Sequence, residues 1–217
     1  MSAARLVVLA SGGGRTLENL QQRILEGRLD ARIALVIVAR ADAGAAARAQ
    51  RLGLACLVIG KQTQPDPERR ARLLQQAVLE ARPDWVVLAG WLSLFPIPPQ
   101  LEGRVLNIHP ALLPDHGGAG CYGCRVHEAV AASGVDHSGC TVHFADAAYD
   151  RGPVLLQTAV PLAPGDDADA IAAKVFAAEC EAYPEALAHL IAGRARLEDG
   201  VVRWSAGADV SAAPRAG

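Results

Sequence analysis

The stretch RLVVLASGGGRTLENL, residues 5–20, sets the pattern that decides the fold. A short apolar run is followed by a glycine-rich turn and then by a helical pattern that begins near Leu17. The same alternation continues along the chain, with further apolar runs at 31–39, 55–59, 84–90 and 104–109. Apolar strands that alternate with helices predict an α/β fold, with a mostly parallel sheet that helices cover on both faces.

The pattern changes after residue 110. The segments GCTVHF (139–144) and PVLLQTAV (153–160) predict an antiparallel strand pair. A long helix is expected over residues 166–193, with Asp166 as its N-cap. Residues 1–200 are therefore expected to form one domain, and the Ala/Gly/Pro-rich residues 201–217 a partly disordered tail.

Composition excludes several classes of protein. The chain has 217 residues, is 51% hydrophobic and carries a formal net charge of -2, so it suits a globular domain and not a nucleic-acid-binding one. Its apolar runs are shorter than the roughly 18 residues of a membrane span, and the first is too short for a signal peptide. We therefore predict a cytoplasmic protein with five free thiols. The CYGC motif (121–124) lacks a second ligand pair, so no metal is predicted.

The glycine-rich turn after the first strand predicts an anion site. Backbone N–H groups converge where a glycine turn opens a helix, and the helix dipole favours negative charge there. Gly12 and Gly14 fit the first two glycines of a dinucleotide fingerprint, but the third position is Leu17. The turn also lacks a Walker lysine, so a single phosphate is favoured over NAD or ATP. A turn that serves only tight packing is the alternative.

Asn107 and His109 lie two residues apart at the end of the fifth apolar run, before Pro110. Alternating strand residues point to the same face, so both side chains should share one face. Ligands of open α/β sheets bind outside the carboxyl ends of the strands, which is where this pair lies. The alternative is a buried structural histidine with a hydrogen-bonded neighbour.

Two carboxylates are ambiguous when each is taken alone. Asp150 lies in a loop before Gly152, where a lone aspartate is usually solvated or caps a turn. Glu179 lies on the edge of an apolar helix stripe that includes Val175. Its carboxylate either reaches solvent or faces a pocket that holds a cation.

Three motifs in this order carry a family resemblance: VVLAGWL (86–92), NIHPALLP (107–114), and GCTVHF (139–144) followed by YDRGPVLLQ (149–157). Together they resemble the glycinamide ribonucleotide formyltransferase family, the folate-dependent enzymes of purine synthesis. The resemblance covers about residues 5–200. It implies a Rossmann-like formyl transferase fold, with 10-formyltetrahydrofolate as co-substrate, glycinamide ribonucleotide as the other small-molecule substrate, and no metal.

The resemblance also implies roles for individual residues. The catalytic residues would be Asn107, His109 and Asp150, and the substrate phosphate would bind at Gly14, Arg15 and Thr16. Glu179 would hold the amine end of the substrate, and the folate would contact Leu92, Ser93, Leu94, Phe95 and Asn107. The chain departs from the family at Ser93, where the family often has an arginine. Pro67 stands near the place of a second folate-contacting arginine.

The expected mechanism is attack of the substrate amine on the formyl carbon. Asn107 and a protonated His109 would donate hydrogen bonds to the developing oxyanion, and Asp150 would raise the pKa of His109. The alternatives are a formyltetrahydrofolate hydrolase, whose motif tends to read NIHH, and a non-catalytic nucleotide-binding module. A methionyl-tRNA formyltransferase is disfavoured because we expect no C-terminal RNA-binding domain with its excess of basic residues, and the formal net charge is -2.

Overall fold

A computed structural model describes residues 3–205 of the chain. The chain divides into two compact units, residues 1–106 and 107–217, and the division falls within strand β5, Val105–His109. The seven-stranded sheet has the strand order β3-β2-β1-β4-β5-β6-β7. The predicted mostly parallel sheet is therefore confirmed, and the two units are described separately below.

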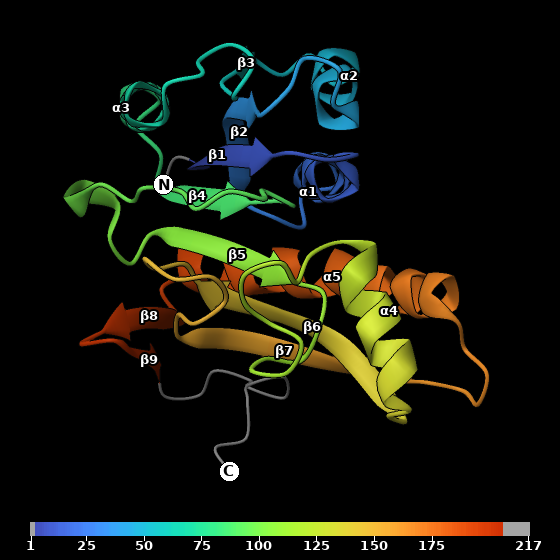
Figure 1. Cartoon of the computed structure of the whole chain (residues 1–217). Helices are drawn as coiled ribbons and strands as arrows, with labels where there is room; N and C mark the ends of the chain where they lie inside the picture. Colours follow the sequence, from blue (N-terminus) through green and yellow to red (C-terminus); the bar gives the residue numbers. More distant parts are fainter. Residues whose placement is uncertain (1–2, 206–217) are drawn as a thin grey trace. The chain divides into compact units, whose positions relative to one another are not determined.

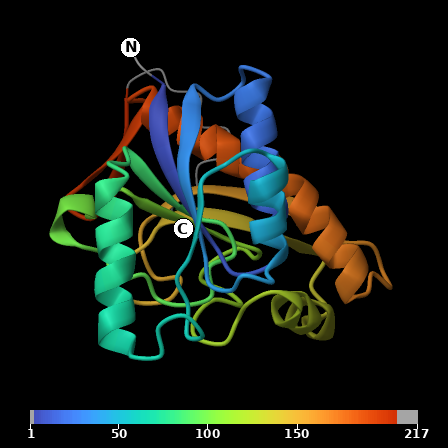
Figure 2. The same ribbon diagram turned by 90° about the horizontal axis from the view of Figure 1, so that it is seen from above.

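Over its described residues, 3–106, the first unit contains four parallel strands and three α-helices. Strand β1 lies between β2 and β4, and β2 also pairs with β3. Helices α1 and α2 cover one face of these strands and α3 covers the other, as Figures 1 and 2 show together. The strands are β1 (Ala4–Ala10), β2 (Ala31–Val38), β3 (Cys56–Val58) and β4 (Trp85–Leu88). The helices are α1 (Arg15–Leu25), α2 (Gly44–Arg51), α3 (Pro67–Glu80) and the short 3-10 helix η1 (Pro99–Leu101).

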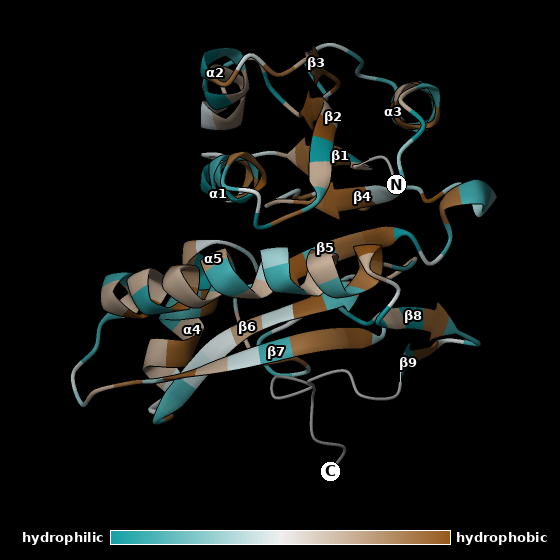
Figure 3. Cartoon of the chain, turned by 180° about the vertical axis from the view of Figure 1, so that it is seen from behind, coloured by the Kyte–Doolittle hydropathy of each residue, from teal (hydrophilic) through white to brown (hydrophobic). Residues whose placement is uncertain are grey.

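The core of this unit is built on β1. Residues 6–10 are completely buried, because helices cover the strand on both faces and every side chain must then be apolar. Figure 3 shows β1 and β4 mainly in brown, the hydrophobic end of its scale. The continuous apolar run that predicted a buried strand is thus explained by the two layers of helix.

The residues at the start of helix α3 explain why the helix begins there. The side chain of Asp66 accepts a hydrogen bond of 2.8 Å from the backbone N–H of Arg69, and Pro67 occupies the first helical position. Proline is favoured there because its fixed φ suits the helix and no N–H is needed. The start of α3 therefore explains why a proline stands at position 67, near the place where the family resemblance implies a folate-contacting arginine.

The second unit contains the predicted antiparallel pair. Strands β6 (His137–Phe144) and β7 (Val154–Pro161) pair in a register that places Thr141 opposite Gln157. Helix α5 (Ala168–Ile191) packs on both strands and against α4 (Cys124–Ser133). None of the helices within residues 3–205 is long and apolar enough to cross a lipid bilayer.

The expected N-cap of α5 is wrong by one residue. Asp167 is the N-cap, and its side chain accepts a hydrogen bond of 2.8 Å from the N–H of Ala170. The neighbouring Asp166 accepts a bond of 2.7 Å from the N–H of Ala163 and pairs with Lys174. Of two adjacent aspartates, the first therefore closes the preceding loop and the second caps the helix.

The start of the expected tail is a strand. Residues Val201–Trp204 form β9, which pairs antiparallel with β8 (Ala195–Glu198). Asp199 and Gly200 connect them, with φ values of 51° and 74°. A two-residue turn with positive φ at both positions matches the twist of a hairpin and favours the Asp-Gly pair, a signal that the sequence interpretation missed. Residues 206–217 of the expected tail lie outside the described residues.

Candidate active site

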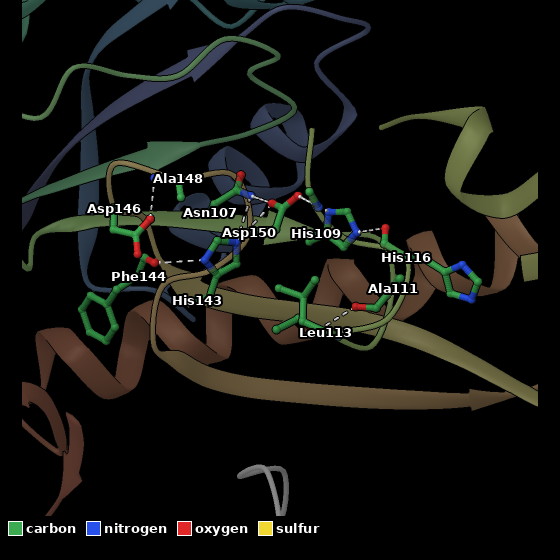
Figure 4. Close-up of polar contacts among 12 residues, drawn as sticks. Asn107, His109, Ala111, Leu113, His116, His143, Phe144, Asp146, Ala148 and Asp150 are labelled. Carbon is green, nitrogen blue, oxygen red and sulfur yellow. Dashed lines mark hydrogen bonds and ion pairs between the residues drawn. The ribbon is translucent and has the colours of Figure 1, made fainter. Parts of the chain in front are cut away.

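Asn107, His109 and Asp150 come together in the second unit, as predicted. Asn107 Nδ2 lies 3.3 Å from Asp150 Oδ1, and His109 Nδ1 lies 3.5 Å from Asp150 Oδ2. Figure 4 shows the carboxylate of Asp150 between the other two side chains. The two residues of β5 therefore share a strand face, because both reach the same carboxylate.

Asp150 is held by more groups than the sequence suggested. The backbone N–H of Gly118 donates to its Oδ2 at 3.0 Å, and His143 Nε2 lies 3.6 Å from its Oδ1. Burial by itself raises the pKa of this carboxyl, but His143, His109 and the Gly118 amide together bring the pKa below its ordinary value. Asp150 is therefore a carboxylate at neutral pH.

The expected rise in the pKa of His109 is wrong for the free protein. The residue is only 3% exposed, and this burial lowers its pKa more than the charge of Asp150 and the His116 carbonyl raise it. The ring is therefore mostly neutral at pH 7. Yet Nδ1 faces Asp150, and Nε2 lies 2.9 Å from the backbone oxygen of His116. Both nitrogens thus face acceptors, so the surroundings suit an imidazolium while burial opposes it.

His143 is a member of the cluster that the sequence interpretation did not select. Its Nδ1 lies 3.0 Å from the Phe144 carbonyl oxygen and donates to it, and in the neutral ring Nε2 is then an acceptor. Asn107 Nδ2 lies 3.1 Å from that Nε2 and also donates to Asp150. Both amide hydrogens of Asn107 are therefore used within the protein. The alternation of Thr141 and His143 on β6 was visible in the sequence, but their contact with Asn107 was not.

Loop 110–118 supplies two backbone groups to the cluster, the carbonyl of His116 and the N–H of Gly118. His116 has a φ of 54° and Asp150 a φ of 55°, both in the left-handed region that few residues other than glycine adopt. Such strained positions gather at functional sites. Backbone contacts do not depend on side-chain identity, so no sequence motif could have revealed these two.

The glycine turn of the first unit has a packing role as well. Gly14 is the N-cap of α1, with a φ of 81°, and a Cβ there would lie 2.6 Å from the Cα of Ala45 in α2. The N–H of Ala45 also donates to the Gly12 oxygen at 3.0 Å. The tight-packing alternative therefore accounts for Gly14. At Gly12 and Gly13, however, an added Cβ would meet nothing within 4 Å, so the turn is open on that side.

The predicted folate segment also lies in the first unit. Leu92, Ser93 and Leu94 are exposed, whereas Phe95 is 4% exposed and belongs to the core. The N–H of Leu92 donates to Ser11 Oγ at 3.2 Å, which ties this segment to the glycine turn after β1. The segment thus has three exposed side chains, and Phe95 anchors it in the core.

Glu179 lies half-buried on α5, beside β6. Burial, together with the negative charge of Glu179, raises the pKa of the Cys140 thiol to about 12. Cys140 points to the face of β6 opposite Thr141, because neighbouring strand residues alternate. The carboxylate of Glu179 is therefore placed on the α5 side of β6.

The cysteines are free thiols, as expected: Cys56, Cys121, Cys124, Cys140 and Cys180 all lie in the described part of the chain. Cys124 is the first residue of α4 and is exposed, whereas Cys121 is half-buried. Within residues 3–205, no group of three or more His, Cys, Asp or Glu side chains is arranged to hold a metal ion.

Known proteins resemble this chain over almost all of its length. A family model described as formyl transferase matches residues 4–187. The chain is 35% identical over 201 residues to the chloroplastic phosphoribosylglycinamide formyltransferase of Arabidopsis thaliana, covering 91% of this chain and 69% of that protein. It is 35% identical over 196 residues to the trifunctional purine biosynthetic protein adenosine-3 of Drosophila pseudoobscura pseudoobscura, covering 88% of this chain and 14% of that protein. The crystal structure of glycinamide ribonucleotide transformylase 1 from Symbiobacterium toebii has a TM-score of 0.84 at 35% identity, with 94% of each chain covered.

Proposed function

This chain belongs to the formyl transferase family, and from that membership we propose that it transfers the formyl group of 10-formyltetrahydrofolate to the amine of glycinamide ribonucleotide. It is a folate-dependent formyltransferase of purine synthesis, in line with the names of its relatives. The observation that carries the proposal is the convergence of Asn107, His109 and Asp150 on one another. A module that only binds nucleotides has no need of this cluster.

The transfer requires one proton to move. The new bond forms between the substrate amine and the formyl carbon, and the bond from that carbon to the folate nitrogen breaks. The amine loses a proton and the folate nitrogen gains one, so a single side chain can accept and return it. His109 suits this role because its neutral ring can take up a proton at neutral pH.

Asp150 and the His116 carbonyl define which nitrogen of His109 acts. In the free protein Nε2 lies 2.9 Å from the His116 carbonyl, which can only accept, so the neutral ring carries its hydrogen on Nε2. When the substrate amine replaces this contact, the negative charge of Asp150 favours the hydrogen on Nδ1 and leaves Nε2 as the basic nitrogen. The resulting imidazolium is stabilised by Asp150, which remains a carboxylate.

Asn107 is the proposed hydrogen-bond donor to the formyl oxygen as that oxygen gains charge. A preorganised donor of this kind contributes on the order of 3 kcal/mol to the transition state. His143 orients the amide, because its Nε2 accepts one of the two amide hydrogens. Asn107 thus presents a fixed donor, although the substrate oxygen must compete with Asp150 for it.

The remaining substrate contacts are proposed from the family membership of the chain. The phosphate binds where the glycine turn meets the N-terminus of the 11-residue helix α1. Its contacts there are Gly14, Arg15 and Thr16. The folate lies along Leu92, Ser93 and Leu94, and Glu179 holds the amine end of the ribonucleotide.

The test is whether tetrahydrofolate formation depends on the amine. The purified protein is mixed with 10-formyltetrahydrofolate, and tetrahydrofolate is followed by absorbance with and without glycinamide ribonucleotide. We expect product only when the ribonucleotide is present, because the amine is the nucleophile. Equal turnover in its absence would identify water as the nucleophile and make the protein a hydrolase.

Gly13 provides a cleaner test of the phosphate site than Gly14. A Cβ at position 13 would meet nothing within 4 Å, so we expect Gly13→Val to change the melting temperature far less than Gly14→Val. Its side chain blocks the approach of the phosphate to the backbone amides, and we expect KM for the ribonucleotide to rise by a factor on the order of 10 to 100. The KM for the folate should not change. Gly14→Val should instead lower the melting temperature, because of the clash with Ala45 and the strained φ. An unchanged KM in Gly13→Val would place the phosphate elsewhere.

A further inference from the structure

Thr141 and Gln157 form a hydrogen-bonded clasp on the loop that follows the catalytic strand. The hydroxyl of Thr141 donates to the carbonyl of Ala111 at 2.7 Å and accepts from the N–H of Leu113 at 3.0 Å. Gln157 Nε2 donates to the carbonyl of Leu113 at 2.9 Å and to Thr141 Oγ1 at 3.0 Å. Ala111 and Leu113 are labelled on this loop in Figure 4.

The clasp uses the full hydrogen-bonding capacity of the Thr141 hydroxyl and of the Gln157 amide nitrogen. A hydroxyl has one hydrogen and two lone pairs, and all three are occupied at Thr141. The amide nitrogen of Gln157 has two hydrogens, and both are donated. Thr141 is completely buried, and the two residues face each other across the β6–β7 pair. The rigid strand pair therefore fixes Ala111 and Leu113 at two backbone positions.

The segment that the clasp holds lies next in the chain to His109 and to the backbone groups that bind His109 and Asp150. Ala111 is two residues from His109, and Leu113 is followed by His116 and Gly118, which bind His109 and Asp150. Leu113 also packs against the loop itself: a Cβ on Gly117 would lie 2.5 Å from Leu113 Cδ2 and 3.4 Å from Asp150 Cβ. The side chains of Leu113 and Asp150 thus both lie close to Gly117.

We propose that Thr141 and Gln157 are positioning residues of the formyl transfer, which hold loop 110–118 so that its backbone keeps His109 and Asp150 in their reactive arrangement. This inference rests on the proposed function for its kinetic consequence. Neither residue needs to touch a substrate. A shift of about 1 Å at the reacting groups reduces the rate by a factor on the order of 100, so loosening the loop affects turnover and not affinity.

The experiment compares Thr141→Val, which removes the hydroxyl at nearly constant volume, with Thr141→Ser, which keeps it. Turnover with 10-formyltetrahydrofolate and glycinamide ribonucleotide gives kcat and both KM values. Amide hydrogen exchange, followed by NMR at Leu113, at Gly118 and along α5, reports the loop without reference to activity.

We expect Thr141→Val to lower kcat by a factor on the order of 10 to 100, with both KM values within about twofold. Exchange should accelerate at Leu113, which loses its acceptor, and also at Gly118, which is bonded to Asp150 and not to the clasp. Exchange in α5 should stay unchanged, and Thr141→Ser should restore kcat to within about threefold. An unchanged kcat in Thr141→Val overturns the proposal, and so does faster exchange at Leu113 without faster exchange at Gly118.

Gln157→Met gives a second test if Thr141→Val does not fold. Gln157 is half-buried, and Met matches its length without its two donors. It should reproduce the loss of kcat and the faster exchange at Gly118, and a wild-type kcat contradicts the proposal. Gln76→Met, the same change at an exposed position of α3, is the matched control.

If the wild-type protein forms no product, the proposed function fails, while the exchange at Gly118 still decides whether the clasp holds the loop.

Discussion

Replacing His109 with alanine should lower kcat by a factor on the order of 10² to 10⁴, which is the contribution typical of a positioned acid–base group. In the proposed mechanism the imidazole accepts the proton of the amine and returns it to the folate nitrogen, so its contribution falls on the transition state. Dissociation constants for the two substrates should therefore change little, because ground-state contacts remain. Rapid-quench measurements of a single turnover, combined with equilibrium binding, separate the two quantities.

The matched control is His137→Ala. His137 is also in the second unit, but its side chain is 60% exposed and its partner is Asp136 at the surface. This variant should retain wild-type kcat. If His109→Ala retained it as well, the proton would move by another route, and the cluster would be structural.

Replacing Asp150 with asparagine should lower kcat by a factor on the order of 10² and shift the pH profile. Asparagine tolerates the positive φ of position 150 better than alanine does, so the change removes the charge with little strain. The carboxylate favours the imidazolium form of His109 and thereby raises its pKa, so without it this pKa falls further below the ordinary value. In the pH profile of kcat, the limb that reflects the titration of His109 should therefore move to lower pH.

The double variant His109→Ala/Asp150→Asn tests whether the two residues act as a unit. Asp150 acts through His109, so the double variant should be little slower than the slower single variant. Losses that simply multiply, together with an unshifted pH profile in Asp150→Asn, would leave Asp150 as a loop residue without influence on the histidine.

The order of elements and two members of the cluster, Asn107 and His109, were accessible from the sequence for physical reasons. Burial on both faces requires continuous apolar strands, and this requirement made β1 and β2 visible as unbroken runs. The two-residue period of a strand placed Asn107 and His109 on one face. The contact of these residues with Asp150, which is distant in sequence, was suggested only by the family motifs.

The sequence could not provide the balance between burial and charge that sets the pKa of His109. It also could not provide the backbone geometry of loop 110–118. The pKa of His109 depends on how deeply the ring is buried, and no local motif reports that depth. The positions of the His116 carbonyl and the Gly118 N–H follow from the path of a loop. The roles of the glycine turn and of Glu179, the cytoplasmic location and the division into a domain and a tail stay predictions.

The two hydrogen bonds of Asn107 affect how tightly the site binds the transition state relative to the substrate. Because both amide hydrogens already have acceptors, the formyl oxygen gains a bond only by displacing Asp150 or His143. A neutral carbonyl is a weaker acceptor than a carboxylate and displaces neither easily. The negatively charged oxygen of the tetrahedral intermediate is a strong acceptor and competes on equal terms. In the proposed mechanism the amide of Asn107 exchanges partners as the reaction proceeds. This exchange favours the charged oxygen over the neutral formamide carbonyl of the substrate, which is the differential binding that accelerates a reaction.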